Sequence, residues 1–123
     1  MGEKKRTERE KTELLISKAM EVLCDMTRQR MPERGVFQKF FVTFDYPGTA
    51  YQAMLWVEPD RTGRAGNGRV TSAMRQDGSD RVIQHYMTVG SKEEIIVWLM
   101  CADNAQLLRA DYEQLKQAAD RLD

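Results

Sequence analysis

The side chains that could carry out chemistry are few in this 123-residue chain and lie far apart in the sequence. His85 is the one histidine and the obvious general base, because the unperturbed pKa of imidazole lies near neutrality. It stands in a strand-like run on the same face as Ile83 and Met87, where a histidine is more often structural than catalytic. The two cysteines, Cys24 and Cys101, have no histidine beside them in sequence that would activate a thiolate.

No group of residues has the spacing of a metal site, and the separation that a paired-carboxylate mechanism needs is not given by a sequence. Two cysteines without a CxxC motif argue against a zinc centre or a disulfide framework, and they suit a reducing compartment. Asp77 and Asp80 fall in a turn, where aspartate is favoured for backbone reasons, and Glu58 and Asp60 flank a proline at a strand end. We therefore predict a protein without catalytic activity, cofactor or bound metal.

A different kind of site is indicated by the arginine- and glycine-rich loop 59–69. Three arginines and three glycines in this loop could bring positive charge and backbone N–H groups to a phosphate or to RNA. The loop lacks the spacing of a GxxxxGK[ST] phosphate-binding motif, and no helix follows it directly. The alternative function is thus a nucleic-acid-binding module. Its candidate contacts are Lys39, Arg61, Arg64, Arg69, Arg75 and Arg81.

Composition limits the class of protein more firmly than any motif does. The chain has 19 basic and 19 acidic residues, so its net charge gives no general attraction to nucleic acid or to a membrane surface. With 41% hydrophobic and 31% charged residues it has a globular composition, and its length suits one domain. No apolar run approaches the roughly 20 residues of a membrane span, and the charged first dozen residues do not resemble a secretory signal. We expect a cytoplasmic protein that does not bind membranes.

The chain begins with helical patterns. Residues 1–13 have no apolar residue after Met1 and are expected to form a frayed, charged lead-in to a single domain of residues 14–123. From Leu14 an amphipathic helix is predicted, which ends before Pro32 because proline disfavours helical geometry in the residue that precedes it. Its apolar stripe consists of Leu15, Ala19, Val22, Leu23 and Met26, and Ile16 and Met20 widen it.

Four antiparallel strands are predicted between residues 36 and 90. Alternating aromatic and β-branched residues mark the first two strands, at 36–46 and 50–57, and strands at 70–75 and 81–89 flank an Asp-Gly turn. The strand at 70–75 is the least apolar of the four, which favours either an edge position or the wet part of a face.

Two helices are predicted after the sheet. Ser91 and Glu94 form a capping box at the start of the first, and residues 95–100 are apolar all round, which predicts a deeply buried helix. Asp103 or Asn104 caps the last helix, whose apolar stripe continues to the end of the chain. The expected fold is α+β: a four-stranded antiparallel meander sheet with one long N-terminal and two C-terminal helices, in the order α-β-β-β-β-α-α.

This order is similar in outline to double-stranded RNA-binding domains, which run helix, three strands, helix. Those domains begin their second helix with basic residues. Here the corresponding Ser91-Lys92-Glu93-Glu94 is net acidic, and the helix that follows is apolar. The likeness therefore extends only to the outline.

The most informative feature is a sheet that carries large apolar groups on both faces. Phe40 and Phe41 must point to opposite faces, and Leu55 opposes its neighbours Met54 and Trp56. A sheet with one wet face would show a clean alternation instead. Both faces are thus expected to be covered, either by helices on each side or by a second copy. The leading hypothesis is a protein-interaction or structural domain that binds itself or another protein through Phe41, Met54 and Trp56.

Overall fold

The computed structural model of the chain describes residues 7–30, 39–60, 66–76 and 82–122. Their elements follow the predicted order α-β-β-β-β-α-α, and the α+β fold class is confirmed. The elements are α1 (Glu8–Arg30), β1 (Phe40–Asp45), β2 (Tyr51–Pro59), β3 (Gly68–Gln76), β4 (Val82–Gly90), α2 (Lys92–Met100) and α3 (Asn104–Leu122). No helix in these ranges is long and apolar enough to cross a lipid bilayer.

Helix α1 begins six residues before the predicted start at Leu14. The hydroxyl of Thr7 accepts the backbone N–H of Glu10 at 3.1 Å and so caps the first turn. The negative charges of Glu8 and Glu10 in this turn also interact favourably with the positive end of the helix dipole. The helix ends at Arg30, ahead of Pro32 as predicted. Val22 was expected in its apolar stripe but is half-exposed, because the buried face is centred on residues such as Ile16, Met20 and Leu23.

The four strands form one antiparallel sheet in the order β1-β2-β3-β4. The turn between β1 and β2 contains a residue with positive φ. This residue is Gly48, at φ 74°, a backbone conformation that glycine adopts without strain. Both alternatives for strand 70–75 are wrong: β3 lies between β2 and β4 rather than at an edge, and Val70 to Met74 are all buried rather than wet. Its small side chains fit the crowded middle of the sheet. The Asp77-Gly78 turn and residues 61–65 of loop 59–69 lie outside the described residues.

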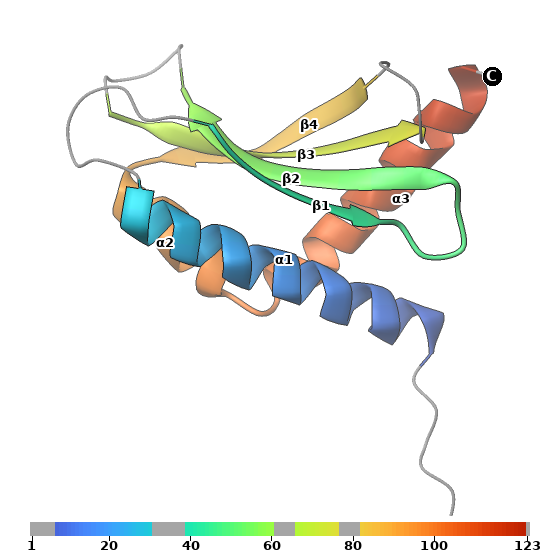
Figure 1. Cartoon of the computed structure of the whole chain (residues 1–123), viewed down its shortest axis with the longest axis horizontal. Helices are drawn as coiled ribbons and strands as arrows, with labels where there is room; N and C mark the ends of the chain where they lie inside the picture. Colours follow the sequence, from blue (N-terminus) through green and yellow to red (C-terminus); the bar gives the residue numbers. More distant parts are fainter. Residues whose placement is uncertain (1–6, 31–38, 61–65, 77–81, 123) are drawn as a thin grey trace, which may run out of the picture.

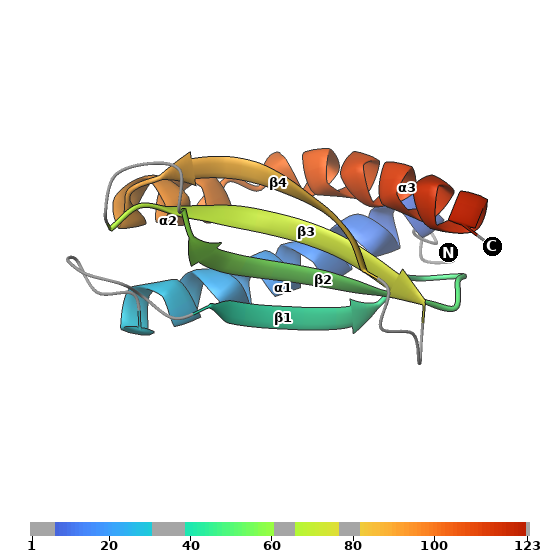
Figure 2. The ribbon, with the colours of Figure 1, turned by 90° about the horizontal axis from the view of Figure 1, so that it is seen from above.

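All three helices pack on the same face of the sheet (Figure 1). Helix α1 contacts β1 and β2, whereas α3 contacts β3 and β4, and α2 packs against α1 and the end of β4. The two views agree that the helices form one layer and the sheet a second (Figure 2). The core between the layers contains Ile16, Leu23, Leu55, Val57, Met74, Ile95, Leu108, Tyr112 and Leu115, among others. Of the two predicted ways of covering both faces, helices on each side are not found within the described residues, where the three helices share one face.

Helix α2 has the predicted capping box but not the predicted burial. The hydroxyl of Ser91 accepts the N–H of Glu94, and the Glu94 carboxylate accepts the N–H of Ser91, both at 3.3 Å. Only Ile95 and Leu99 are buried. The prediction of a deeply buried helix is wrong, because α2 lies at one end of the helix layer and packs with one side only. Two outward residues, Val97 and Met100, are 67% and 62% exposed.

Candidate functional site

The face of the sheet turned away from the helices, here called the open face, carries a row of aromatic residues. The register places Phe41, Trp56, Thr71 and Tyr86 side by side, one from each strand. Phe41 and Tyr86, on the two edge strands, are 44% and 64% exposed, whereas Trp56 between them is only 2% exposed. Successive side chains along each strand point to opposite faces, so the sheet has the two apolar faces that the sequence indicates. The helices cover one of these faces.

Trp56 is covered by side chains of its own face. The ring of Phe41 lies 5.3 Å from it, centroid to centroid, and the Nζ of Lys39 lies 4.3 Å from the Trp56 centroid and 4.7 Å from that of Phe41. The indole Nε1–H donates to a carboxylate oxygen of Glu58. The three predicted interface residues therefore differ in exposure. Phe41 is exposed, Met54 is half-buried in the next row of the same face, and Trp56 is buried under its neighbours.

Glu58 connects the aromatic row to two basic residues. Its Oε1 accepts Nε–H of Arg69 at 2.7 Å, and its Oε2 lies 3.7 Å from Nζ of Lys39. Burial alone would raise the pKa of this carboxyl group. The hydrogen bonds from Trp56 and Arg69, with the charges of Arg69 and Lys39, outweigh that effect and hold the pKa below its ordinary value. Glu58 therefore stays ionised, and it neutralises part of the positive charge on the open face.

The lowered pKa of Glu58 predicts a loss of stability in acid. A carboxyl group whose pKa is lower in the folded chain stabilises the fold above its unfolded value of about 4.5, and this stabilisation disappears as the pH falls through the folded value. At pH 7, Glu58→Gln should lower the free energy of unfolding by about 1 kcal/mol. Urea unfolding between pH 7 and pH 2.5 checks this, because the gap between wild type and variant should close in acid. Parallel curves would contradict the assignment.

The residues predicted to contact nucleic acid are only partly brought together. Lys39, Arg69 and Arg75 all lie on the open face, where the Arg69 guanidinium stacks 4.8 Å from the Tyr86 ring centroid and Arg75 donates to Gln52. Arg61, Arg64 and Arg81 lie outside the described residues. The three described cations therefore belong to the same surface as the predicted apolar interface, and Tyr86 is an open-face aromatic residue that the sequence-based selection did not include.

One buried polar atom on this face is unsatisfied. Thr71 is 1% exposed, and its hydroxyl oxygen Oγ1 has no hydrogen-bond partner. Among the described residues, no other buried side-chain oxygen or nitrogen lacks one. It lies between Trp56 and Tyr86 in the aromatic row. A buried hydroxyl without a partner costs stability, and this atom lies beneath the open face rather than on it.

His85 lies on the helix-covered side and forms a link to α3. Its Nδ1 lies 2.8 Å from Oδ1 of Asp111, and the other oxygen of Asp111 accepts the hydroxyl of Ser72. Ser72 is fully buried and donates to the carboxylate rather than to the imidazole. The described geometry thus differs from a nucleophile-base pair, which needs the hydroxyl on the histidine. The three residues join β3, β4 and α3, a contact that no spacing in the sequence indicates.

The two cysteines have different surroundings. Cys24 is buried, its thiol faces the carbonyl oxygen of Ile96 at 3.9 Å, and burial raises its pKa, so the reactive thiolate is disfavoured. Cys101 is exposed at the end of α2. Within the described ranges, no three histidine, cysteine or acidic side chains are grouped so that they could hold a metal ion.

Comparisons with known proteins add no further information on this surface. No protein-family model, curated protein or solved structure matches the chain.

Proposed function

We propose that the protein is a non-catalytic interaction module that forms a homodimer through the open face of its sheet. The observation that carries the proposal is the one-sided helix layer, with Phe41 and Tyr86 exposed on the opposite face. Aromatic residues, methionine and arginine are the types enriched at protein interfaces, and the open face also contains Met54, Arg69 and Arg75.

The size of the open face favours a dimer of moderate affinity. Four strands spaced about 4.8 Å apart, over seven residues at about 3.4 Å each, make a flat area of roughly 450 Å². A stable interface commonly buries about 800 Å² on each partner. We therefore expect association at micromolar rather than nanomolar concentration. In this proposal the protein acts in the cytoplasm, where the free thiols Cys24 and Cys101 stay reduced.

Measuring molecular mass in solution tests the proposal. Light scattering or sedimentation equilibrium over a hundredfold concentration range should show a monomer–dimer equilibrium for the wild type. Phe41→Glu should abolish the dimer, since two carboxylates would be buried in the interface. Val22→Glu is the matched control: Val22 is 50% exposed but lies on α1 in the helix layer, and this variant should dimerise normally.

Two results would refute the dimer. One is a wild type that stays monomeric at high concentration, and the other is equal association by both charge variants. Circular dichroism of each variant shows whether it is folded, so that a loss of association is not confused with unfolding.

A second candidate function is single-stranded nucleic acid binding by the same face. The specific observation is that Lys39 and Arg69 lie over the rings of Phe41, Trp56 and Tyr86, since cations beside stacking platforms are typical of such surfaces. Fluorescence anisotropy with labelled oligo-dT and oligo-U would then show binding that weakens steeply with salt. Lys39→Ala and the triple change of Arg61, Arg64 and Arg69 to alanine should each weaken it; unchanged affinity would exclude this function.

A further inference from the structure

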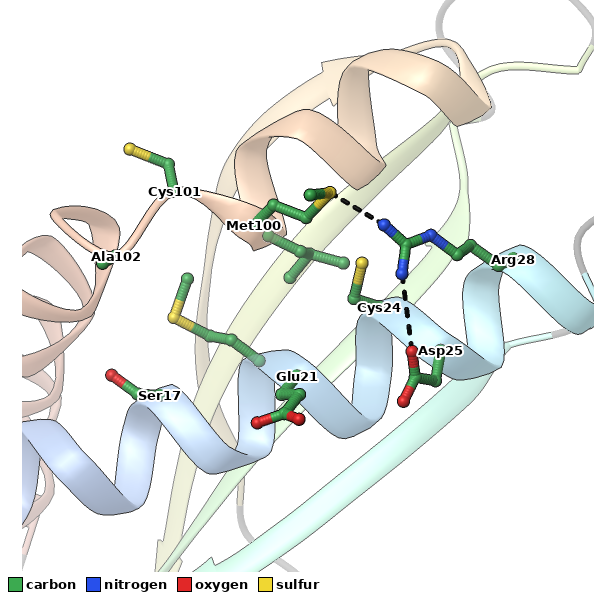
Figure 3. A pocket seen from close by; sticks show the side chains of 10 residues that line it. Ser17, Glu21, Cys24, Asp25, Arg28, Met100, Cys101 and Ala102 are labelled. Atoms are coloured by element: carbon green, nitrogen blue, oxygen red, sulfur yellow. Dashed lines mark hydrogen bonds and ion pairs between the residues drawn. The ribbon is translucent and has the colours of Figure 1, made fainter.

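The helix layer carries a second surface, centred on the junction between α2 and α3 at Cys101 and Ala102. Three hollows adjoin there, of about 280, 330 and 470 Å³. The first lies between α1 and the end of α2 (Figure 3), and it shares Ser17 and Ala102 with the second. The third, along α2, shares Cys101 with the first. Because their linings overlap, we treat the three as one region, the junction surface.

Large apolar side chains are exposed in the junction surface. Val97 and Met100, three residues apart on α2, project outward, and Leu14 of α1 is 45% exposed at the second hollow. Met100 lines the first hollow, and Figure 3 shows it beside Arg28, whose Nη2 lies 2.8 Å from its sulfur. Exposed apolar side chains that line adjoining hollows in this way favour a docking surface.

The rim of the junction surface is strongly acidic. Among the described residues that line the three hollows there are six carboxylates and one guanidinium, that of Arg28. The carboxylates are Glu10, Glu13, Glu21, Asp25, Glu93 and Glu94. Two are neutralised in part, since Asp25 pairs with Arg28, and Glu13 pairs with Arg9 and Arg109. The remaining acidic residues flank the exposed apolar side chains on both α1 and α2.

We propose that the junction surface binds a positively charged amphipathic helix of another protein. An apolar stripe on such a helix would lie on Met100 and Val97, and its lysine or arginine residues would face the carboxylates of the rim. Charge complementarity selects this occupant, because an acidic segment would be repelled and a purely apolar one would leave the rim unpaired. The proposal does not depend on the homodimer, because the junction surface belongs to the helix layer and the dimer surface to the opposite face.

A designed peptide tests the proposal on the full chain. The probe is an idealised helix of about 18 residues with leucine at helical spacing and lysine elsewhere. Its controls are a scrambled peptide of the same composition and a version with glutamate in place of every lysine. Isothermal titration calorimetry should show saturable binding of the probe that weakens with salt, and little binding of either control.

Variants locate the binding site. Met100→Gln should weaken binding of the probe roughly tenfold, as expected for loss of a central apolar contact. Val22→Gln, an equivalent change at an exposed apolar residue that lines none of the hollows, should leave the affinity unchanged. The double variant Glu21→Gln with Glu93→Gln should weaken binding and reduce its salt dependence.

Methionine methyl signals give an independent readout. In NMR spectra with labelled methionine methyl groups, the probe should shift the signal of Met100 on α2 and leave that of Met54 on the open face in place. Three results would overturn the proposal: equal binding by the scrambled peptide, full affinity of Met100→Gln, or shifts at Met54 instead of Met100. Stronger binding of the glutamate peptide would show that the sign of the partner's charge is wrong.

Discussion

Trp56→Ala is expected to lower the free energy of unfolding by about 3–5 kcal/mol, as deletion of a large buried aromatic side chain does. The prediction is unusual for a residue on the face of a sheet that no described helix covers. It follows from the 2% exposure of the ring, its contact with Phe41 and Lys39, and its hydrogen bond to Glu58. Removing the ring also leaves the partly buried Glu58 carboxylate with one donor fewer. Chemical denaturation at low protein concentration, where association is negligible, measures the loss.

Two further variants separate packing from hydrogen bonding at Trp56. Trp56→Phe keeps an aromatic ring but removes the donor to Glu58, so it should cost less than the alanine variant. Phe41→Ala removes a ring that is already 44% exposed and should cost about 1 kcal/mol. If Trp56→Ala cost no more than Phe41→Ala, the ring would not be packed as described. A stability loss also means that changes at Trp56 are unsuitable for testing the dimer, which is why Phe41 is used.

Strand and face assignments could be predicted because they depend on a period of two. Phe40 and Phe41 had to point to opposite faces in any strand, and the register of β1 and β2 places Phe40 in the core and Phe41 on the open face. The capping box of Ser91 and Glu94 was equally local, because both of its hydrogen bonds join residues three apart. Features of this kind depend only on residues close together in the sequence, and they can therefore be predicted from it.

The placement of the helices could not be predicted in the same way. An apolar stripe shows which side of a helix is buried, but not which face of the sheet it meets. The run from Ile95 to Met100 has apolar residues all round, so no periodicity indicated that Val97 and Met100 would be exposed. The link of His85 to Asp111 joins residues 26 positions apart, and only the packing of α3 against β4 brings them together. The junction surface depends on the same tertiary packing.

The two proposed surfaces are compatible in one assembly. If two copies meet through their open faces, both helix layers point outward, because α1, α2 and α3 all lie on the other side of each sheet (Figure 1). The junction surface, with Met100 and Val97, would then stay accessible on both copies. A dimer of this form would present two acidic, apolar surfaces on its opposite sides. Loss of the dimer in Phe41→Glu should accordingly leave one junction surface on each monomer.

Tyr112→Ala is the second change with a large expected effect, again about 3–5 kcal/mol in the free energy of unfolding. Tyr112 is fully buried on α3 and joins the helix to the sheet. Its ring meets Phe44 edge-on at 5.7 Å and Tyr46 at 5.9 Å, centroid to centroid. Its hydroxyl donates to the backbone oxygen of Met54 at 2.9 Å, and burial raises its pKa, so the phenol stays neutral and keeps this bond.

Tyr112→Phe tests how the contribution divides between the ring and the hydroxyl. It keeps both ring contacts but leaves the Met54 carbonyl without this donor, so a loss of about 1 kcal/mol is expected. Because Met54 lies on β2, the variant should also speed amide hydrogen exchange locally along β2 while the rest of the sheet stays protected. A loss in Tyr112→Phe as large as that in Tyr112→Ala would mean that the hydroxyl, rather than the aromatic packing, fixes α3 against the sheet. Equal stability of Tyr112→Ala and wild type would contradict the docking of α3 itself.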